Sequence, residues 1–417
     1  MPPLRVPRQL RSDQMESLAT SLGRTIGPLH LTEKLTSTDP LAIPLAIQAV
    51  ISWSRYNNGG VVRTAVDFTE EPSATRALQR NALLLVGTLL ASTIESTSGE
   101  DVTSAATTAA RRAISESGTI PTRGSGVTIG AERSVLAVDH FSGLQYPTGL
   151  YRRTRDARTG HLDHALDTSA HELYARASVD ESRPSDWPLG WRALAMSRVS
   201  LAHDERFEFE AAELGRALFE LMQNTHDHAR VDDAGYTLRR SVRGVHVRSF
   251  TQLRSDLVRS AEGHADLARY FSTLPSGLDA TSHNDGDRLR LVAVTVFDSG
   301  PGIAARGLRQ MGFKHDASFE QEQRATFSAL RKSDEAAQPG MRGMGLTRVQ
   351  RYLTAVGGYA MVRCGRLQLT RDFLNRKFAE PDRQADWYAG FRTAAKHVRT
   401  HGTAFTMIVP TYGGGHE

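Results

Sequence analysis

Apolar residues in the first part of the chain follow two patterns, the alternation typical of strands and the spacing typical of helices. Apolar and polar residues alternate over residues 28–35 and 60–68, as in strands, and apolar residues recur at helical spacing over 42–56. A second helical pattern covers residues 72–96. This β-α-β-α order predicts an α/β domain near the N-terminus.

The same two hydrophobic patterns predict a larger set of helices and strands in the second part of the chain. We expect a long helix over residues 208–228, strands over 236–250 and a helix over 253–274. Residues 288–297 give the clearest strand, because apolar side chains occupy both alternating sets of positions. A strand of this kind is buried on both faces, so we expect other layers on each side of it.

A polar segment at residues 178–190 carries two prolines and follows neither the helical nor the strand-like hydrophobic pattern. We interpret it as a linker between a smaller α/β domain, residues 1–180, and a C-terminal domain, residues 190–417; an ordinary surface loop is the alternative. Residues 36–40, placed like a strand-to-helix loop, make the first domain similar to STAS-like regulatory modules. Residues 1–180 offer no recognisable catalytic constellation, and their role stays open.

Composition points to a folded, water-soluble protein. Hydrophobic residues make up 40% of the chain and charged residues 23%, with 51 basic and 46 acidic residues and a formal charge of +5. Clustered arginines could contact phosphates, although solvated surface arginines are the alternative, so a nucleic-acid partner is left open but not indicated. These clusters are Arg239, Arg240, Arg243 and Arg248, and Arg152, Arg153, Arg155 and Arg158.

The cysteine and hydropathy patterns indicate a cytoplasmic protein. Cys364 is the single cysteine of the sequence, which favours a reducing compartment and a buried apolar role for its thiol. The longest apolar stretch, residues 82–91, has about ten residues, whereas a membrane-spanning helix needs about twenty. Residues 1–20 lack the apolar block of a signal peptide. We therefore expect no membrane partner.

The first chemical motif lies on the helix expected at 208–228. Helical spacing places Glu220, Asn224 and the pair Asp227 and His228 along one stripe, opposite apolar residues such as Leu218. An asparagine carbonyl suits Mg²⁺, and a carboxylate one turn away could activate a water molecule. A solvated helix face, with Glu220 paired to a neighbouring arginine such as Arg216, is the alternative.

The second motif follows the strand at 288–297. Asp298 stands at the end of this strand, and Gly300 and Gly302 follow it. A carboxylate there can accept a hydrogen bond from an exocyclic amine such as that of adenine. The glycines would let the main chain approach the ring, although a plain strand-to-turn sequence looks similar.

Two further motifs complete the set. Residues 340–348 include Gly343, Gly345 and Leu346 and run into an expected helix, whose N-terminus would favour phosphate. This string is neither a Walker loop nor a Rossmann fingerprint. Thr403 begins an apolar strand at 401–410 and could reach a base or its bound water; the edge of a sheet is the alternative interpretation.

The order of these four motifs resembles that of the GHKL families, which include gyrase-type topoisomerases, ninety-kilodalton heat-shock chaperones, MutL-type repair proteins and histidine kinases. The resemblance covers about residues 205–411. It implies a Bergerat-type α/β sandwich, in which helices cover a mixed sheet, and a site for ATP and Mg²⁺. The long segment between Asn224 and Asp298 departs from a minimal domain and implies an inserted helical segment around residues 251–275.

The resemblance also implies a role for each motif residue. Glu220 would be the water-activating base and Asn224 the Mg²⁺ ligand. Further nucleotide contacts would come from the helix end, the strand end, the glycine loop and the last strand, and residues 303–340 would form a mobile lid. These contacts are Asp227, His228, Asp298, Gly300, Gly302, Gly343, Gly345, Leu346 and Thr403.

Several functional classes fit this pattern. We expect an ATPase that drives a conformational switch or a partner interaction. A serine kinase of the anti-sigma type fits the spacing of His228 and stays an alternative, as does nucleotide binding without turnover. A histidine-kinase-like protein is a further alternative, although an acceptor such as His203 would need a separate hairpin and lies too close to Glu220 for one. A protein client is the expected partner, and a homodimer is left open.

Overall fold

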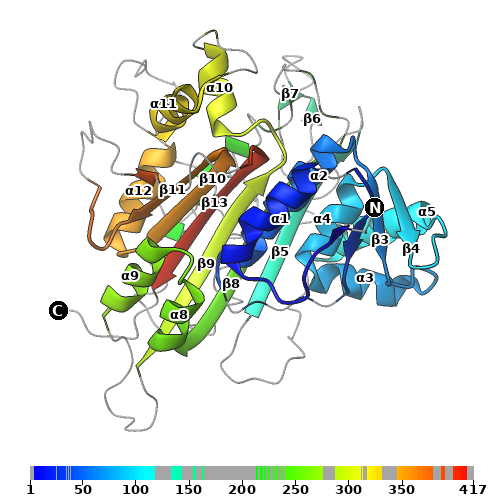
Figure 1. Cartoon of the computed structure of the whole chain (residues 1–417), viewed down its shortest axis with the longest axis horizontal. Helices are drawn as coiled ribbons and strands as arrows, with labels where there is room; N and C mark the ends of the chain where they lie inside the picture. Colours follow the sequence, from blue (N-terminus) through cyan, green and yellow to red (C-terminus); the bar gives the residue numbers. More distant parts are fainter. Residues whose placement is uncertain are drawn as a thin grey trace.

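The computed structural model describes most of the chain, in several stretches. These are residues 4–117 apart from 25, 34, 36 and 38, then 133–142, 154–155, 162–163, individual residues between 213 and 238, and 240–275, 287–310, 312, 317–330, 345–378, 387–389 and 398–410. Within them the protein has an α/β fold with two main sheets, one parallel and one antiparallel (Figure 1). None of the described helices is long and apolar enough to cross a bilayer.

The first sheet lies in the N-terminal unit, which we define as residues 4–117. Four parallel strands are arranged in chain order, and helices connect them, as the alternating pattern predicts. The strands are β1 (Leu4–Arg5), β2 (Leu29–Leu31), β3 (Val61–Thr64) and β4 (Thr93–Ser96), and the helices are α1 (Ser12–Arg24), α2 (Ala42–Tyr56), α3 (Glu71–Arg80), α4 (Ala82–Leu90) and α5 (Thr103–Ser117).

The helix expected at 42–56 is confirmed as α2, but the helix expected at 72–96 is wrong. Asn81 ends α3, and its side-chain oxygen accepts hydrogen bonds at 3.0 Å from the main-chain N–H groups of Leu83 and Leu84. This is an N-cap, so a new helix begins at the next residue. The last residues of the expected helix form β4 instead.

The second sheet has seven strands in the order β12-β11-β10-β13-β9-β8-β5, and all of its pairings are antiparallel. The expected mixed sheet is therefore corrected to an antiparallel one, in which long strands lie beside oppositely directed neighbours. The strands are β5 (Arg133–Ser142), β8 (Arg240–Leu253), β9 (Arg288–Asp298), β10 (Tyr359–Gly365), β11 (Leu367–Asp372), β12 (Tyr388–Ala389) and β13 (Thr400–Pro410).

Strand β5 precedes the expected linker at 178–190 in the sequence yet pairs with β8 over its whole length. The linker itself lies outside the described residues. Two very short strands, β6 (Thr154–Arg155) and β7 (Leu162–Asp163), form a separate pair. Residues before the expected boundary thus contribute to the large sheet.

The helix expected at 253–274 is two helices, α8 (Arg254–Ser260) and α9 (Ala265–Thr273). Gly263 lies between them at a close approach to α1, because a Cβ there would stand 2.8 Å from the Cβ of Asp13. The described residues of the helix expected at 208–228, from Glu213 to Thr225, are helical. Three further helices are α10 (Ile303–Gln310), α11 (Phe319–Leu330) and α12 (Gly345–Ala355).

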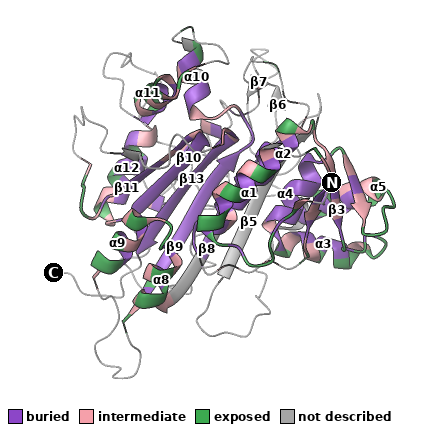
Figure 2. Ribbon diagram, viewed as in Figure 1, coloured by how far each residue is buried: buried purple, intermediate pink, exposed green. Residues whose placement is uncertain are grey.

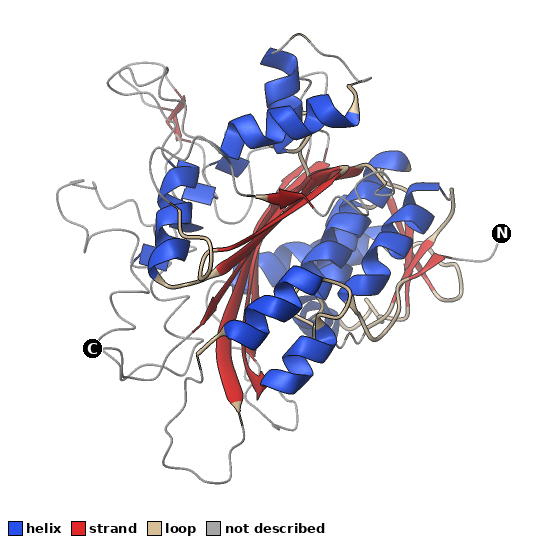
Figure 3. Cartoon of the chain, turned by 60° about the vertical axis from the view of Figure 1, so that its left-hand side comes forward, coloured by secondary structure: helices blue, strands red, loops and turns tan. Residues whose placement is uncertain are grey.

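Helices lie on both sides of the seven-stranded sheet, whose central strands β9, β10 and β13 are largely buried (Figures 2 and 3). On the side that we call the α12 face, Val292, Val294 and Val296 of β9 belong to one core with Leu218 and Leu353. On the opposite side, the α2 face, the alternate residues of β9 belong to a core that includes α1, α2, α4, α8 and α9. The expectation that this strand is buried on both faces is confirmed.

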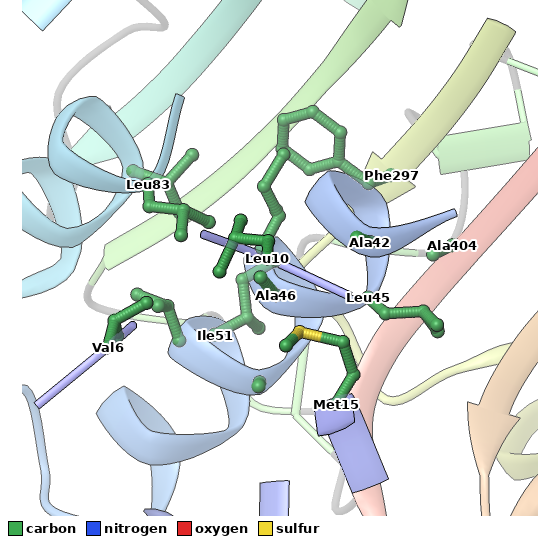
Figure 4. Packing of buried hydrophobic residues seen from close by; sticks show 14 of the residues in the cluster. Val6, Leu10, Met15, Ala42, Leu45, Ala46, Ile51, Leu83, Phe297 and Ala404 are labelled. Atoms are coloured by element: carbon green, nitrogen blue, oxygen red, sulfur yellow. The ribbon is translucent and has the colours of Figure 1, made fainter. Parts of the chain in front are cut away.

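The α2 face joins the N-terminal unit to the large sheet in one continuous core. Ala42 and Leu45 of α2 lie near Phe297 of β9 and Ala404 of β13 (Figure 4). All four side chains are at least 93% removed from solvent, with Leu45 the most exposed at 7%. The two sheets therefore share the helices between them.

Candidate functional site

A row of side chains crosses four neighbouring strands at one end of the seven-stranded sheet. Cys364 of β10 pairs with Thr403 of β13, Thr403 with Asp298 of β9, and Asp298 with Arg243 of β8. Asp298 continues the series Val292, Val294 and Val296, so it belongs to the α12 face. Thr403 is consequently a central-strand residue, so the alternative interpretation as the edge of a sheet is wrong.

The carboxyl group of Asp298 is buried and held by neighbouring donors. Its exposed fraction is 6%, and its Oδ1 accepts a hydrogen bond of 2.9 Å from the Gly300 N–H. Burial raises the pKa of Asp298 to about 6, against the opposing effects of hydrogen bonds from Gly300 and Thr403 and of the Arg243 charge. At neutral pH the group is a mostly ionised, desolvated acceptor at a strand end, and a pKa perturbed in this way is common at functional sites.

Glycines pack the main chain tightly around Asp298. A Cβ on Gly300 would stand 2.4 Å from the Cα of Ala229, and one on Gly402, whose φ is +76°, would stand 1.9 Å from the Asp298 carbonyl oxygen. Gly402 also donates its N–H to the Gly300 carbonyl at 2.8 Å. Gly302 has a φ of +87° and faces the Gly402 carbonyl, so each of these positions requires glycine.

Glu220 meets the first turn of α12. Its Oε1 accepts a hydrogen bond of 2.5 Å from Nη1 of Arg348, and a Cβ on Gly345 would stand 2.6 Å from its Oε2. The ion partner among the described residues is therefore Arg348. The structure brings together the acidic residue of the first motif and the glycine-led helix of the third.

The end of the Asn224 helix reaches the Asp298 turn. Asn224 is helical and half-buried, and the neighbouring Thr225 carbonyl accepts a hydrogen bond of 2.9 Å from the N–H of Ala229, which packs on Gly300. Leu346 is partly buried against the core of the α12 face. Asp227, His228 and Gly343 lie outside the described residues. Their roles, and the assignment of Asn224 as a Mg²⁺ ligand, stay predictions.

The described part of the expected lid includes α10 and α11, and hydrogen bonds connect α11 to the large sheet. Glu322 of α11, 2% exposed, accepts hydrogen bonds of 2.8 Å from both the main-chain N–H and Nε of Arg366, between β10 and β11. A Cβ on Gly365 would stand 1.7 Å from Oε1 of Glu322, so the approach is very close. Residues 331–340 lie outside the described residues.

Sequence reasoning missed three contributors to this site. Arg243 was one of a cluster that the sequence left as either phosphate-binding or solvated, yet Arg243 is 2% exposed and Arg248 is 1% exposed. Strand alternation with the buried Val245 could have placed Arg243 on the α12 face. Gly402 stands in the motif at 401–410 and Arg348 in the one at 340–348, but their contacts depend on spatial neighbours and leave no local signal. The other cluster, around Arg155, has no described side chains.

The described residues contain no group of three or more His, Cys, Asp or Glu side chains placed to hold a metal ion. Cys364 is buried as expected, and burial raises the pKa of its thiol to about 12, so it is an unreactive thiol at neutral pH. Comparison of the chain with protein-family models, with curated proteins and with solved structures found no match. The chemistry of the site must therefore be argued from its own geometry.

Proposed function

We propose that the chain binds ATP with Mg²⁺ in a Bergerat-type site on the α12 face and hydrolyses the nucleotide. The observation that carries this proposal is the buried carboxyl group of Asp298, which lies beside Thr403 at the end of a central strand. Tightly packed glycines surround it, and α12 begins beside the helix that bears Glu220 and Asn224. Described residues of all four motifs belong to elements of the α12 face, which supports the proposal.

Each group has a definite task in this site. The Asp298 carboxylate accepts a hydrogen bond from the exocyclic amine of adenine, and the hydroxyl of Thr403 lies beside it. The N-terminal turn of α12, led by Gly345, offers main-chain N–H groups and the positive end of a helix dipole to phosphate. The amide oxygen of Asn224 would hold Mg²⁺, a cation that prefers oxygen ligands.

Glu220 is the proposed general base. Its carboxylate is ion-paired with Arg348 in the structure, so it must exchange that partner for a water molecule before it can accept a proton. Both charged groups lie beside the first turn of α12, where the terminal phosphate would arrive. A phosphate there would compete with Glu220 for the arginine, which couples nucleotide binding to release of the base.

The first test removes the proposed adenine reader. Asp298→Asn should weaken ATP binding by about tenfold or more, because a charge-assisted hydrogen bond is lost. Isothermal calorimetry would compare it with Asp256→Asn, which removes a carboxylate that is 51% exposed in α8 and should leave the affinity unchanged. Equal ATP affinity of Asp298→Asn and the parent, with both folded, would remove the proposal.

A second measurement separates hydrolysis from phosphoryl transfer. With γ-labelled ATP, an ATPase releases labelled inorganic phosphate, whereas a kinase transfers the label to protein. We expect release, and label retained on the chain or on an added protein would favour the kinase alternative. Binding without either product would leave a nucleotide-binding module.

A further inference from the structure

One stripe of α2 contacts the main chain of the large sheet at the same end as the proposed nucleotide site. Gln48, Ser52, Arg55 and Tyr56 have the spacing of residues on one side of a helix. The rest of α2 is mostly apolar and packs within the shared core, so this polar stripe is a distinct feature of the helix.

The contacts of the stripe are directed at particular main-chain atoms. Nε2 of Gln48 donates to the carbonyl of Arg363 at 2.7 Å and to that of Gly402 at 3.3 Å. The main-chain N–H of His401 donates to the Ser52 hydroxyl at 2.9 Å, and the Tyr56 ring packs edge-on against the His401 ring at 5.0 Å.

Arg55 makes the corresponding contact with the other strand end. Its Nη2 and Nε donate to the Ser299 carbonyl at 2.8 and 3.2 Å, and Nη2 lies 3.2 Å from the Ser299 hydroxyl. Ser299 in turn exchanges hydrogen bonds with Val242, through its own N–H at 2.9 Å and its hydroxyl at 2.8 Å. Arg55 is thereby linked to both β8 and β9.

Two of these acceptors, Ser299 and Gly402, are direct neighbours of the proposed nucleotide-reading residues. Ser299 follows Asp298, and Gly402 precedes Thr403. Successive residues of a strand point to opposite faces, so a donor on the α2 face can hold the main chain while the next side chain serves the α12 face. The stripe therefore holds the two strand ends whose side chains would contact adenine.

The buried polar groups of the stripe are costly unless their position matters. Gln48 is 1% exposed, and among the described residues its Oε1 has no hydrogen-bond partner. A buried polar atom without a partner destabilises the fold, whereas an apolar side chain of similar size would not. Gln48 nevertheless supplies two directed contacts, one to Gly402 of β13 and one to Arg363 of the neighbouring strand β10, which favours a positioning role over simple packing.

We propose that Gln48 and Arg55 of the N-terminal unit are positioning residues of the nucleotide site. They hold the ends of β9 and β13 in register, so that the Asp298 carboxyl and the Thr403 hydroxyl meet the adenine edge together. The inference rests on the proposed ATP site and gives the N-terminal unit a role in its affinity and base selectivity.

The test measures base selectivity, which a loss of stability alone does not change. Arg55→Met and Gln48→Met should each weaken ATP binding by about tenfold and reduce the preference for ATP over GTP, because three and two hydrogen bonds to the strands are lost, respectively. Arg55→Lys keeps a donor near the Ser299 carbonyl and should recover part of the affinity. Calorimetry with ATP and with GTP at a temperature where each variant is folded provides both readouts.

Arg63→Met is the matched control, because Arg63 lies in β3 of the same unit and pairs with Glu95 away from the strand ends. It should keep the parent's affinity and selectivity. Parent-like affinity and selectivity in both Arg55→Met and Gln48→Met would overturn the positioning role while leaving the ATP site in place. A parent chain that binds neither nucleotide would overturn the ATP site, and the positioning role with it.

Discussion

The two faces of the seven-stranded sheet use buried polar groups in different ways. On the α2 face, Arg363 donates to the carbonyls of Gly365, Leu367 and Val398 at 2.6 to 3.2 Å and pairs with Glu16 of α1 at 3.2 Å. On the α12 face, the carboxyl group of Asp298 is buried at the end of a strand with a pKa raised to about 6. Burial disfavours both charges, since it also lowers the pKa of Arg363, but the Arg363 guanidinium has four acceptors in the surrounding strands, loop and helix.

From this difference we infer which polar groups serve the fold, and we propose that the Asp298 carboxyl serves a ligand instead. Arg363 and Arg248 tie the sheet to the N-terminal unit; Arg248 donates to the carbonyl of Asp39 at 2.9 Å. The hydroxyls of Thr295 and Thr406 pair with each other on the same face at 2.9 Å. Contacts of this kind stabilise one arrangement of the layers, whereas a buried acid with a raised pKa is typical of a functional site.

Gly402 accepts a hydrogen bond from Gln48 on the α2 face and lies against the Asp298 carbonyl. Among the changes considered, Gly402→Ala should have the largest effect on stability. A Cβ at position 402 would stand 1.9 Å from the Asp298 carbonyl oxygen. The φ of Gly402 is +76°, a backbone conformation that residues other than glycine rarely adopt. We expect a loss of stability on the order of 4 kcal/mol, together with loss of ATP binding. Urea unfolding would measure the stability.

Gly99→Ala is the matched control for Gly402→Ala. Gly99 has a φ of +87° but no atom within 4 Å of the added Cβ, so only the backbone term of about 1 kcal/mol should appear. The difference between the two variants isolates the close contact. Similar losses in both would show that the approach of Gly402 to Asp298 adds nothing to stability.

The raised pKa of Asp298 predicts an intermediate effect that depends on pH. The folded state holds a proton up to about pH 6, whereas the unfolded chain releases it near 3.8, so this group contributes most stability below about pH 4. That contribution should fall by about 2 to 3 kcal/mol as the pH rises to about 6 and should then level off.

Asp298→Asn removes this titration and leaves the other carboxyl groups in place. The difference in unfolding free energy between the parent and this variant should shift in favour of the variant from pH 4 to pH 6. A difference that stays constant over this range would show that burial does not raise the pKa of Asp298.

The sequence predicted those elements whose pattern is local. The alternation of Leu289 and Leu291 with Val292 and Val294 was enough to place β9 and to predict that both of its faces are covered. The spacing of apolar residues likewise placed α2 at its exact bounds. The capping side chain of Asn81 was overlooked, although its effect is also local.

Features that depend on distant partners could not be predicted in this way. Nothing in residues 133–142 indicates that β5 pairs with β8, because the choice of a strand partner depends on the whole sheet. The requirement for glycine at position 402 comes from the nearby Asp298 carbonyl. The contact of Arg55 with Ser299 joins residues that are far apart in the sequence. Motif order placed Asp298 and Thr403 in one site, but it could not show what holds them there.

The ion pair of Glu220 and Arg348 should give the smallest effect on stability and the sharpest distinction between structural and chemical roles. The two side chains are 16% and 44% exposed, so Glu220→Gln and Arg348→Gln should each change the unfolding free energy by at most about 1 kcal/mol.

As a general base, Glu220 should contribute about a hundredfold to ten-thousandfold to hydrolysis and little to ATP affinity. Glu220→Gln should therefore bind ATP like the parent and hydrolyse it far more slowly. Arg348→Gln loses the proposed phosphate contact and should bind ATP more weakly, but it keeps the base and should retain much more activity at saturating ATP. Equal losses of steady-state phosphate release in both variants would instead assign Glu220 a structural role through its arginine. Parent-like release in Glu220→Gln at saturating ATP would remove it as the base.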